Sequence, residues 1–160
     1  MLAIGLALVL IAAPHCGVKM ILVWNASPSV PIGLYLIVQK PMAQGEIALI
    51  NLPPPIAALA DARGYLPRSA YLLKPIRALG GDRVCRIGLT LFVNGRPVAT
   101  APMADIAGRA LPRWSGCRHL RDDDIFFLGR SANSFDSRYF GPLNINAVVG
   151  RAQPLWILND

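Results

Sequence analysis

The hydrophobic residues of this chain form one long apolar run at the start, followed by short runs separated by turns. Residues 1–24 carry only His15 and Lys19 as strongly polar side chains and open with L-A-I-G-L-A-L-V-L-I-A-A. About 20 apolar residues suffice to cross the hydrocarbon core of a bilayer as a helix. The pattern therefore predicts a transmembrane helix over residues 1–24. A retained anchor is favoured over a removed secretory signal, because no basic residue precedes the run.

Beyond residue 24 the pattern is typical of a sheet protein. Short runs of apolar and β-branched residues alternate with Gly, Pro and polar turns. Asn94-Gly95 lies between two apolar stretches and indicates a β-hairpin. Residues 100–124 are polar and without period, so we expect a long loop there. The other predicted elements are strands at 34–39, 46–51, 125–128 and 147–158, and a short helix at 56–63.

The predicted fold is mainly β, with an N-terminal transmembrane helix followed by a single β domain. Residues 25–160 are numerous enough for one domain that buries roughly two-thirds of the surface of its unfolded chain. We therefore divide the chain into a membrane anchor at 1–24, or an uncleaved signal, and one domain at 25–160.

Composition and charge narrow the class of partner. The chain is 54% hydrophobic and 16% charged, with a mean hydropathy of +0.43, which excludes a disordered tail. Its net charge of +7 favours an anionic neighbour such as lipid headgroups or nucleic acid. The basic residues are scattered and no basic cluster is interleaved with aromatic residues, so a nucleic-acid partner is not expected.

The cysteines do not predict a metal site. Cys16, Cys85 and Cys117 show no C-x-x-C spacing, and His15 and His119 are the two histidines of the chain. Four zinc ligands are hard to assemble from this set, so we expect neither metal nor cofactor. Cys85 and Cys117 could form a disulfide in an oxidising compartment or remain free thiols, and the spacing leaves both open.

The first candidate for chemistry is the segment N-A-S-P-S-V-P, residues 25–31. Pro28 and Pro31 restrict the backbone on either side of Ser29, so the Ser29 hydroxyl and backbone N–H could be held in a defined direction. A nucleophile needs such an arrangement. Taken alone, such a segment is more typical of a linker.

A serine nucleophile needs a base, and Lys74 is the candidate. The chain has 13 Arg but only three Lys, and Lys74 is the one beyond residue 40. Arginine does not lose its proton in proteins, whereas burial lowers the pKa of a lysine so that it can act as a neutral base. Lys74 lies in the apolar segment Y-L-L-K-P-I. The alternative is a strand lysine whose amine reaches solvent.

The third candidate is the polar segment 130–141, R-S-A-N-S-F-D-S-R-Y-F-G. Asp136 and Arg138 could form an ion pair that makes the segment rigid, and a serine hydroxyl such as that of Ser134 could then hold the Lys74 amine. The alternative is a solvated turn.

Together, the three segments resemble the motifs of the type I signal peptidase family, which uses a Ser/Lys dyad. S-V-P at 29–31, K-P-I-R-A-L-G-G-D-R-V at 74–84 and N-S-F-D-S-R-Y-F-G at 133–141 stand in the order of the three boxes of that family. The G-L-Y after the first box and the F-D-S-R-Y-F-G-P wording resemble its conjugative transfer branch, the TraF-like peptidases. Val30 stands where the larger enzymes have Met.

The resemblance implies a role for each matching residue. Ser29 would be the nucleophile and Lys74 the general base. Ser27 would supply a hydroxyl that forms the oxyanion hole together with the Ser29 N–H, and Ser134 would orient the lysine amine. The supporting residues would be Asp136 and Arg138.

The implied function is a membrane-anchored serine endopeptidase that processes an exported precursor, in particular conjugative pilin, through an acyl-enzyme. The implied place is the bacterial inner membrane, with residues 25–160 in the periplasm, although Lys19 weakly favours the reverse topology. The implied partners are the precursor, inner-membrane lipid and components of a conjugation or type IV secretion apparatus. Release of the product by hydrolysis or by cyclisation stays open, and the alternative function is a non-catalytic membrane-anchored assembly protein.

Overall fold

The computed structural model describes residues 8–12 and 20–158, and these residues form a mainly β protein, as predicted. Its internal contacts divide the chain into two compact units. The first contains Met1–Met42, Glu46–Lys74 and Asn146–Asp160, and the second contains Ala43–Gly45 and Pro75–Ile145. Strand β5 (Leu72–Ala78) belongs to both units, because the chain passes from the first to the second after Lys74. The predicted single domain over residues 25–160 stays a prediction.

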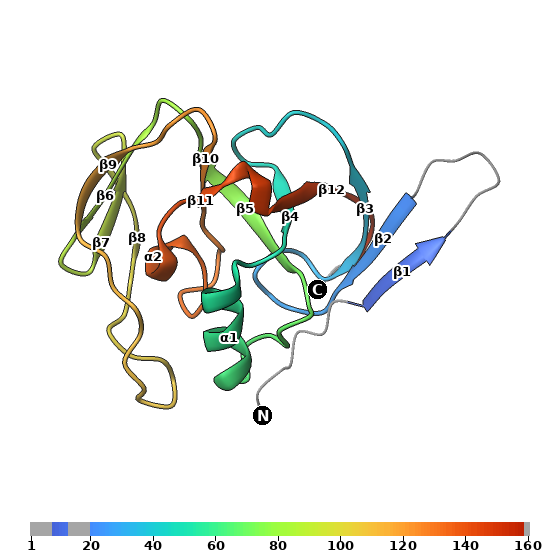
Figure 1. Ribbon diagram of the computed structural model, residues 1–160, viewed down its shortest axis with the longest axis horizontal. Coiled ribbons are helices and arrows are strands. Elements are labelled where there is room, and N and C mark those ends of the chain that lie inside the picture. The colour runs from blue at the N-terminus through green and yellow to red at the C-terminus, as the bar shows by residue number, and fades with distance from the viewer. Residues whose placement is uncertain (1–7, 13–19, 159–160) are drawn as a thin grey trace. The chain divides into compact units, whose positions relative to one another are not determined.

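The first unit is built on an antiparallel sheet whose strand order is β1-β2-β3-β12-β4 (Figure 1). The strands predicted at 34–39, 46–51 and 147–158 are confirmed with small shifts at their ends. The five strands are β1 (Leu8–Ala12), β2 (Met20–Asn25), β3 (Gly33–Val38), β4 (Ile47–Ile50) and β12 (Val148–Ile157).

The N-terminal segment differs from the predicted transmembrane helix. Residues 8–12 and 20–24 pair as antiparallel strands, from Leu8 opposite Trp24 to Ala12 opposite Met20. The rest of the predicted span, residues 1–7 and 13–19, lies outside the described residues. In the described part of the chain, neither helix has the length and hydropathy needed to span a bilayer. An apolar segment can pair its backbone groups within a helix or in a sheet, and β3 offers β2 a strand edge with which its backbone groups can pair.

The core of the first unit lies against this sheet and includes residues from the two segments that carry the candidate dyad. Val30 is 2% exposed and Leu73 is 4% exposed, and both pack in one cluster with Tyr35. The other buried members of this cluster are Val23, Ile37, Leu49 and Ala152.

The predicted short helix is confirmed as α1 (Pro54–Ala62). Proline occupies its first turn, where the missing N–H costs no hydrogen bond. The helix ends before Gly64, whose φ of +68° is a conformation that glycine adopts without strain.

The second unit contains a four-stranded sheet with the order β8-β7-β6-β9 (Figure 1). The predicted hairpin joins β7 to β8, and Asn94 and Gly95 have φ angles of +50° and +78°, as a type I′ turn requires. The Asn94 side chain also accepts a hydrogen bond from the Arg83 N–H at 2.9 Å. The strands are β6 (Arg83–Ile87), β7 (Thr90–Val93), β8 (Arg96–Thr100) and β9 (Gly116–His119).

The prediction of a long loop over residues 100–124 was wrong at β9. This strand pairs with β6, and Cys117 lies opposite Cys85 and forms a disulfide with it. All four residues of β9 are exposed, so the strand has no alternation of buried and exposed side chains. Backbone pairing and a covalent bond hold it, and neither leaves a hydrophobic pattern in the sequence.

The second unit also contains β10 (Asp124–Phe127), which pairs with β5 and with β11 (Leu143–Asn144). This strand confirms the prediction at 125–128, and its side chains from Ile125 to Phe127 are buried. Helix α2 (Ser137–Phe140) was not predicted, and a 3-10 turn, η1 (Ile145–Ala147), precedes β12.

Candidate active site

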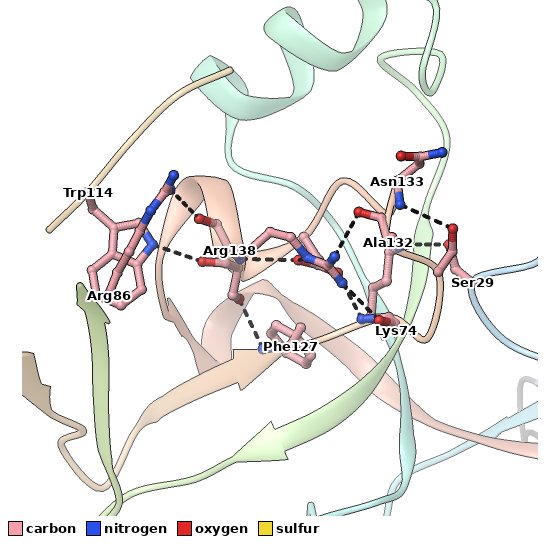
Figure 2. A network of polar contacts seen from close by, with 12 residues as sticks. Ser29, Lys74, Arg86, Trp114, Phe127, Ala132, Asn133 and Arg138 are labelled. Carbon is pink, nitrogen blue, oxygen red and sulfur yellow. Dashed lines mark hydrogen bonds and ion pairs between the residues drawn. The ribbon is translucent and has the colours of Figure 1, made fainter. Parts of the chain in front are cut away.

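The structure brings the two residues of the predicted dyad together in the first unit. Lys74 Nζ lies 2.5 Å from Ser29 Oγ, within hydrogen-bond distance. Both side chains are buried, with 9% of Ser29 and 2% of Lys74 exposed. They are drawn as sticks in Figure 2. Ser29 lies in the loop between β2 and β3, and Lys74 lies on β5.

A common core holds these two residues in place. Val30 and Leu73, the chain neighbours of Ser29 and Lys74, are both members of the buried cluster of the first unit. Because packed side chains in a core have little freedom, anchoring one neighbour on each side restricts the separation of the two functional groups. Val30 serves as such an anchor.

Hydrogen bonds also fix the C-terminal end of the loop that carries Ser29, residues 26–32. The Tyr35 hydroxyl donates a hydrogen bond of 2.6 Å to the Pro31 carbonyl, and the Leu158 N–H donates to the Ile32 carbonyl at 2.9 Å. Gly33 follows with a φ of +155°, and a Cβ atom there would lie 2.1 Å from the Trp156 carbonyl oxygen. Glycine is therefore required where β3 begins beside β12.

Ser27 lies in the same loop, and a residue that the sequence reasoning missed holds it. The Ser27 N–H and hydroxyl both donate to Asn25 Oδ1, at 3.2 and 3.1 Å. Asn25 is 4% exposed. An Asn two residues before a Ser, at the end of an apolar strand, is the pattern of a side chain that bonds the backbone of a turn, and this pattern could have pointed to Asn25.

The segment predicted to be rigid carries a buried ion pair in the second unit. Arg138 Nε lies 2.8 Å from Asp136 Oδ1, with both side chains at most 2% exposed. Arg138 also donates to the carbonyl oxygens of Ala132 and Gly129, each at 2.9 Å, and Asp136 Oδ2 accepts the Gly129 N–H at 2.8 Å. Figure 2 shows these contacts around Arg138. The pair thus ties both ends of the turn between β10 and α2, as the ion-pair hypothesis expected.

Ser134 lies within this turn and is 4% exposed. Its N–H donates to the Ser131 carbonyl at 3.1 Å. Its side chain packs against Gly129 so closely that a Cβ atom on Gly129 would lie 2.3 Å from Ser134 Oγ. Its predicted role toward Lys74 stays a prediction.

Two further residues of the second unit support the turn and were not found from the sequence. Arg86 Nη1 donates to the Arg138 carbonyl at 2.7 Å, and Trp114 Nε1 donates to the Ser137 carbonyl at 3.0 Å (Figure 2). Burial lowers the pKa of the Arg86 guanidinium from its ordinary value. Neither residue belongs to a recognisable motif, and only the folded chain brings β6 and residue 114 to α2.

The described residues also show where His119 lies and whether a group of side chains could hold a metal ion. His119 is exposed on β9, in the second unit. Within residues 8–12 and 20–158, no group of three or more His, Cys, Asp or Glu side chains is placed to hold a metal ion. A serine hydroxyl next to a buried lysine amine can act as nucleophile and base, because the amine in its neutral form can remove the hydroxyl proton.

Comparison with known proteins shows the family of the chain. The chain belongs to the signal peptidase family, described as "Signal peptidase, peptidase S26", which matches residues 1–157. The resemblance seen in the three boxes is thereby confirmed.

Its relatives point to one branch of that family. A probable conjugal transfer protein TraF of Sinorhizobium fredii (strain NBRC 101917 / NGR234) is 36% identical over 141 residues, which are 81% of this chain and 73% of the relative. A plasmid transfer protein TraF of Escherichia coli is 33% identical over 143 residues, which are 82% and 80% of the two chains.

A crystal structure of a signal peptidase I from Enterococcus faecalis V583 aligns with a TM-score of 0.40 and 20% identity, over 76% of this chain and 100% of that one.

Proposed function

We propose that this chain is a serine endopeptidase that cuts an exported precursor protein during conjugation, with Ser29 as nucleophile and Lys74 as general base. The observation that carries the proposal is the 2.5 Å separation of Lys74 Nζ and Ser29 Oγ in a buried setting. Membership in the signal peptidase family supports the reaction class, and the names of the TraF relatives support the connection with conjugation.

The reaction follows from the chemistry of the pair. Ser29 Oγ attacks the carbonyl carbon of the scissile peptide bond, and Lys74 Nζ takes the hydroxyl proton. The same proton then passes from Lys74 to the leaving amine as the C–N bond breaks, which leaves an ester between the substrate and Ser29. A water molecule, or the amine at the other end of the substrate chain, then attacks the ester carbonyl and gives a proton to Lys74. Lys74 passes this proton to Ser29 Oγ as the ester C–O bond breaks, which restores the free hydroxyl.

The negative charge that develops on the carbonyl oxygen needs hydrogen-bond donors. In the proposal these are the Ser29 N–H and the Ser27 hydroxyl. Ser134 orients the Lys74 amine, and the Asp136–Arg138 pair keeps the turn of Ser134 rigid. Ser27 and Ser134 thus stabilise the oxyanion and orient the base, and the ion pair keeps Ser134 in place. The bonds themselves are made and broken at Ser29 and Lys74.

We also propose where the chain works and what it cuts. The apolar composition of residues 1–24 supports attachment to the inner membrane, and the Cys85–Cys117 disulfide supports a periplasmic position for the folded units, because disulfides persist in oxidising compartments. The proposed substrate is a pilin precursor with small side chains before the cut. Its other proposed partners are inner-membrane lipid and components of the conjugation apparatus.

The deciding experiment compares matched variants of the full-length chain in the cleavage of an internally quenched peptide with alanine one and three positions before the scissile bond. Ser29→Ala and Lys74→Arg are each expected to abolish cleavage, because an alanine has no nucleophile and an arginine keeps its proton. Their controls are Ser69→Ala and Lys40→Arg, at exposed positions, which should cut at the normal rate.

The outcomes separate the two candidate functions. A non-catalytic assembly protein predicts that transfer of a conjugative plasmid is independent of Ser29 and Lys74. Near-normal cleavage by Ser29→Ala would refute the proposed nucleophile. Near-normal cleavage by Lys74→Arg, with Ser29→Ala inactive, would refute lysine as the base.

A further inference from the structure

Asn25 is the last residue of β2, and its buried side chain is the centre of the loop that carries Ser29. It takes part in five hydrogen bonds, all to residues of this loop. Asn25 Nδ2 donates to the carbonyl oxygens of Ser27, Val30 and Pro31, at 2.8, 3.1 and 3.0 Å, with one of its two hydrogens shared between two of these acceptors. Asn25 Oδ1 accepts the N–H and the hydroxyl of Ser27.

The partners themselves determine how this amide is oriented. Carbonyl oxygens can only accept hydrogen bonds, so the group facing the three carbonyls is the NH₂ group. The Ser27 N–H can only donate, so the group facing it is the amide oxygen. With that oxygen as its partner, the Ser27 hydroxyl is the donor in its contact with Asn25.

These contacts lie on both sides of the nucleophile. One carbonyl belongs to Ser27, two residues before Ser29, and the others belong to Val30 and Pro31, immediately after it. A single side chain therefore sets the path of the backbone through Ser29. This path determines where the Ser29 hydroxyl and its N–H point.

We propose that Asn25 is the residue that positions the nucleophile loop and holds the Ser27 hydroxyl ready for the oxyanion. The inference rests on the proposed function. Ser27 has one hydroxyl proton, and the resting structure gives it to Asn25 Oδ1. When the oxyanion forms, the hydroxyl turns toward it, and Asn25 Oδ1 keeps the Ser27 N–H as a partner. Release of the hydroxyl thus leaves no buried acceptor unpaired.

The first test measures the loop without any substrate. In hydrogen–deuterium exchange of the full-length chain, Asn25→Ala should speed exchange of the backbone N–H groups of residues 26, 27, 29, 30 and 32 at least tenfold. The reason is that the Ser27 N–H loses its acceptor and the carbonyls around Ser29 lose their common donor. Exchange in residues 83–93, in the second unit, should stay unchanged. The matched control is Asn144→Ala, which removes an asparagine side chain bonded to Asp123 and should leave residues 26–32 unchanged. Unaltered exchange of residues 26–32 in Asn25→Ala would overturn the inference.

The second test distinguishes a positioning role from a purely structural one, with the same quenched peptide. Asn25→Ala should lower kcat at least tenfold with KM within about twofold of normal, since the loop holds reacting groups. Combined with Ser27→Ala, it should cost little beyond the slower single variant, because both changes remove the same aimed hydroxyl. Losses that multiply in the double variant would mean that Asn25 does not act through Ser27.

These readouts keep the inference separable from the proposed function. If the unaltered chain cuts and Ser29→Ala does not, normal kcat in Asn25→Ala would overturn the inference alone. If the unaltered chain does not cut, the proposed function fails, and the exchange measurement still decides whether Asn25 orders the loop.

Discussion

Lys74 and Lys40 show how strongly position changes the chemistry of one residue type. Lys40 is exposed, whereas Lys74 is 2% exposed and lies against the Ser29 hydroxyl. Burial disfavours the charged ammonium form of a lysine and leaves the neutral amine unpenalised. The contact between Lys74 Nζ and Ser29 Oγ suits both protonation states, because an ammonium donates to the hydroxyl and an amine accepts from it. In the proposed mechanism, the protonation state of the Lys74 amine thus decides whether the Ser29 proton can be removed.

The first prediction at the residue scale concerns pH. Below the pKa of Lys74 the ammonium has no lone pair and cannot take the Ser29 proton, so the rate should rise with pH as Lys74 loses its proton and then level off. Cleavage of the quenched peptide from pH 5 to 10 measures this. The His119→Ala variant is the control and should show the same profile. A rise near pH 6 to 7, where histidine ordinarily titrates, that disappears in His119→Ala would contradict lysine as base.

Among the elements, the turn between β10 and α2 depends on a glycine that allows its two sides to approach. The Gly129 N–H donates a hydrogen bond to Asp136, and the Gly129 carbonyl accepts one from Arg138. The Ser134 side chain fills the space where a Cβ atom on Gly129 would lie, with Ser134 Oγ at 2.3 Å and Ser134 Cβ at 2.9 Å from it. The position of Ser134 is therefore set by a residue that has no side chain and by an ion pair that closes the turn.

The prediction at the element scale uses this close contact. Gly129→Ala should lower the free energy of unfolding by about 1 to 3 kcal/mol, as overpacking does in a tightly packed site, and should also slow cleavage. The double variant Gly129→Ala with Ser134→Gly removes both clashing atoms and should recover stability. Cleavage should not recover with it, because the Ser134 hydroxyl is gone. Recovery of both would mean that Ser134 has no role beyond packing.

At the scale of the whole molecule, a covalent link bears on where the chain works. The disulfide joins β9 to β6 in the second unit, and β9 has four exposed residues that contribute nothing to a core. A cytosolic chain would keep these thiols reduced and would hold β9 by backbone pairing alone. The sequence left the pairing of Cys85 with Cys117 open. In the structure the two residues are paired, and this disulfide supports the proposed periplasmic position.

The last prediction tests that compartment. Protease added to spheroplasts should digest residues beyond 24, because these lie in the periplasm in the proposal. A cytosolic protein of the same cells is the control and should stay intact until lysis. Protection of this chain until lysis would reverse the proposed topology. Thiol trapping before isolation should find Cys85 and Cys117 oxidised, and free thiols at both would remove the structural support for export.

Local sequence determined many of the secondary-structure elements and pointed to two candidate residues of the site. The strands of the first unit, the hairpin at Asn94-Gly95 and the short helix after residue 53 follow from periodicity and turn residues, whose effects extend over a few neighbours. The residues Ser29 and Lys74 could be singled out because Ser29 is bracketed by prolines and Lys74 is an isolated lysine in an apolar setting. Such signals need no knowledge of distant contacts.

The tertiary structure decided the rest, because the deciding partners are far apart in the chain or leave no pattern. Strand β9 is stabilised by pairing with β6 and by a disulfide, so its four exposed residues carry no hydrophobic period. The N-terminal apolar run could satisfy its backbone groups in a helix or in a sheet, and β2 pairs with β3. Ser29 and Lys74 are 45 positions apart in the chain, and their 2.5 Å contact exists because their neighbours Val30 and Leu73 pack in one core.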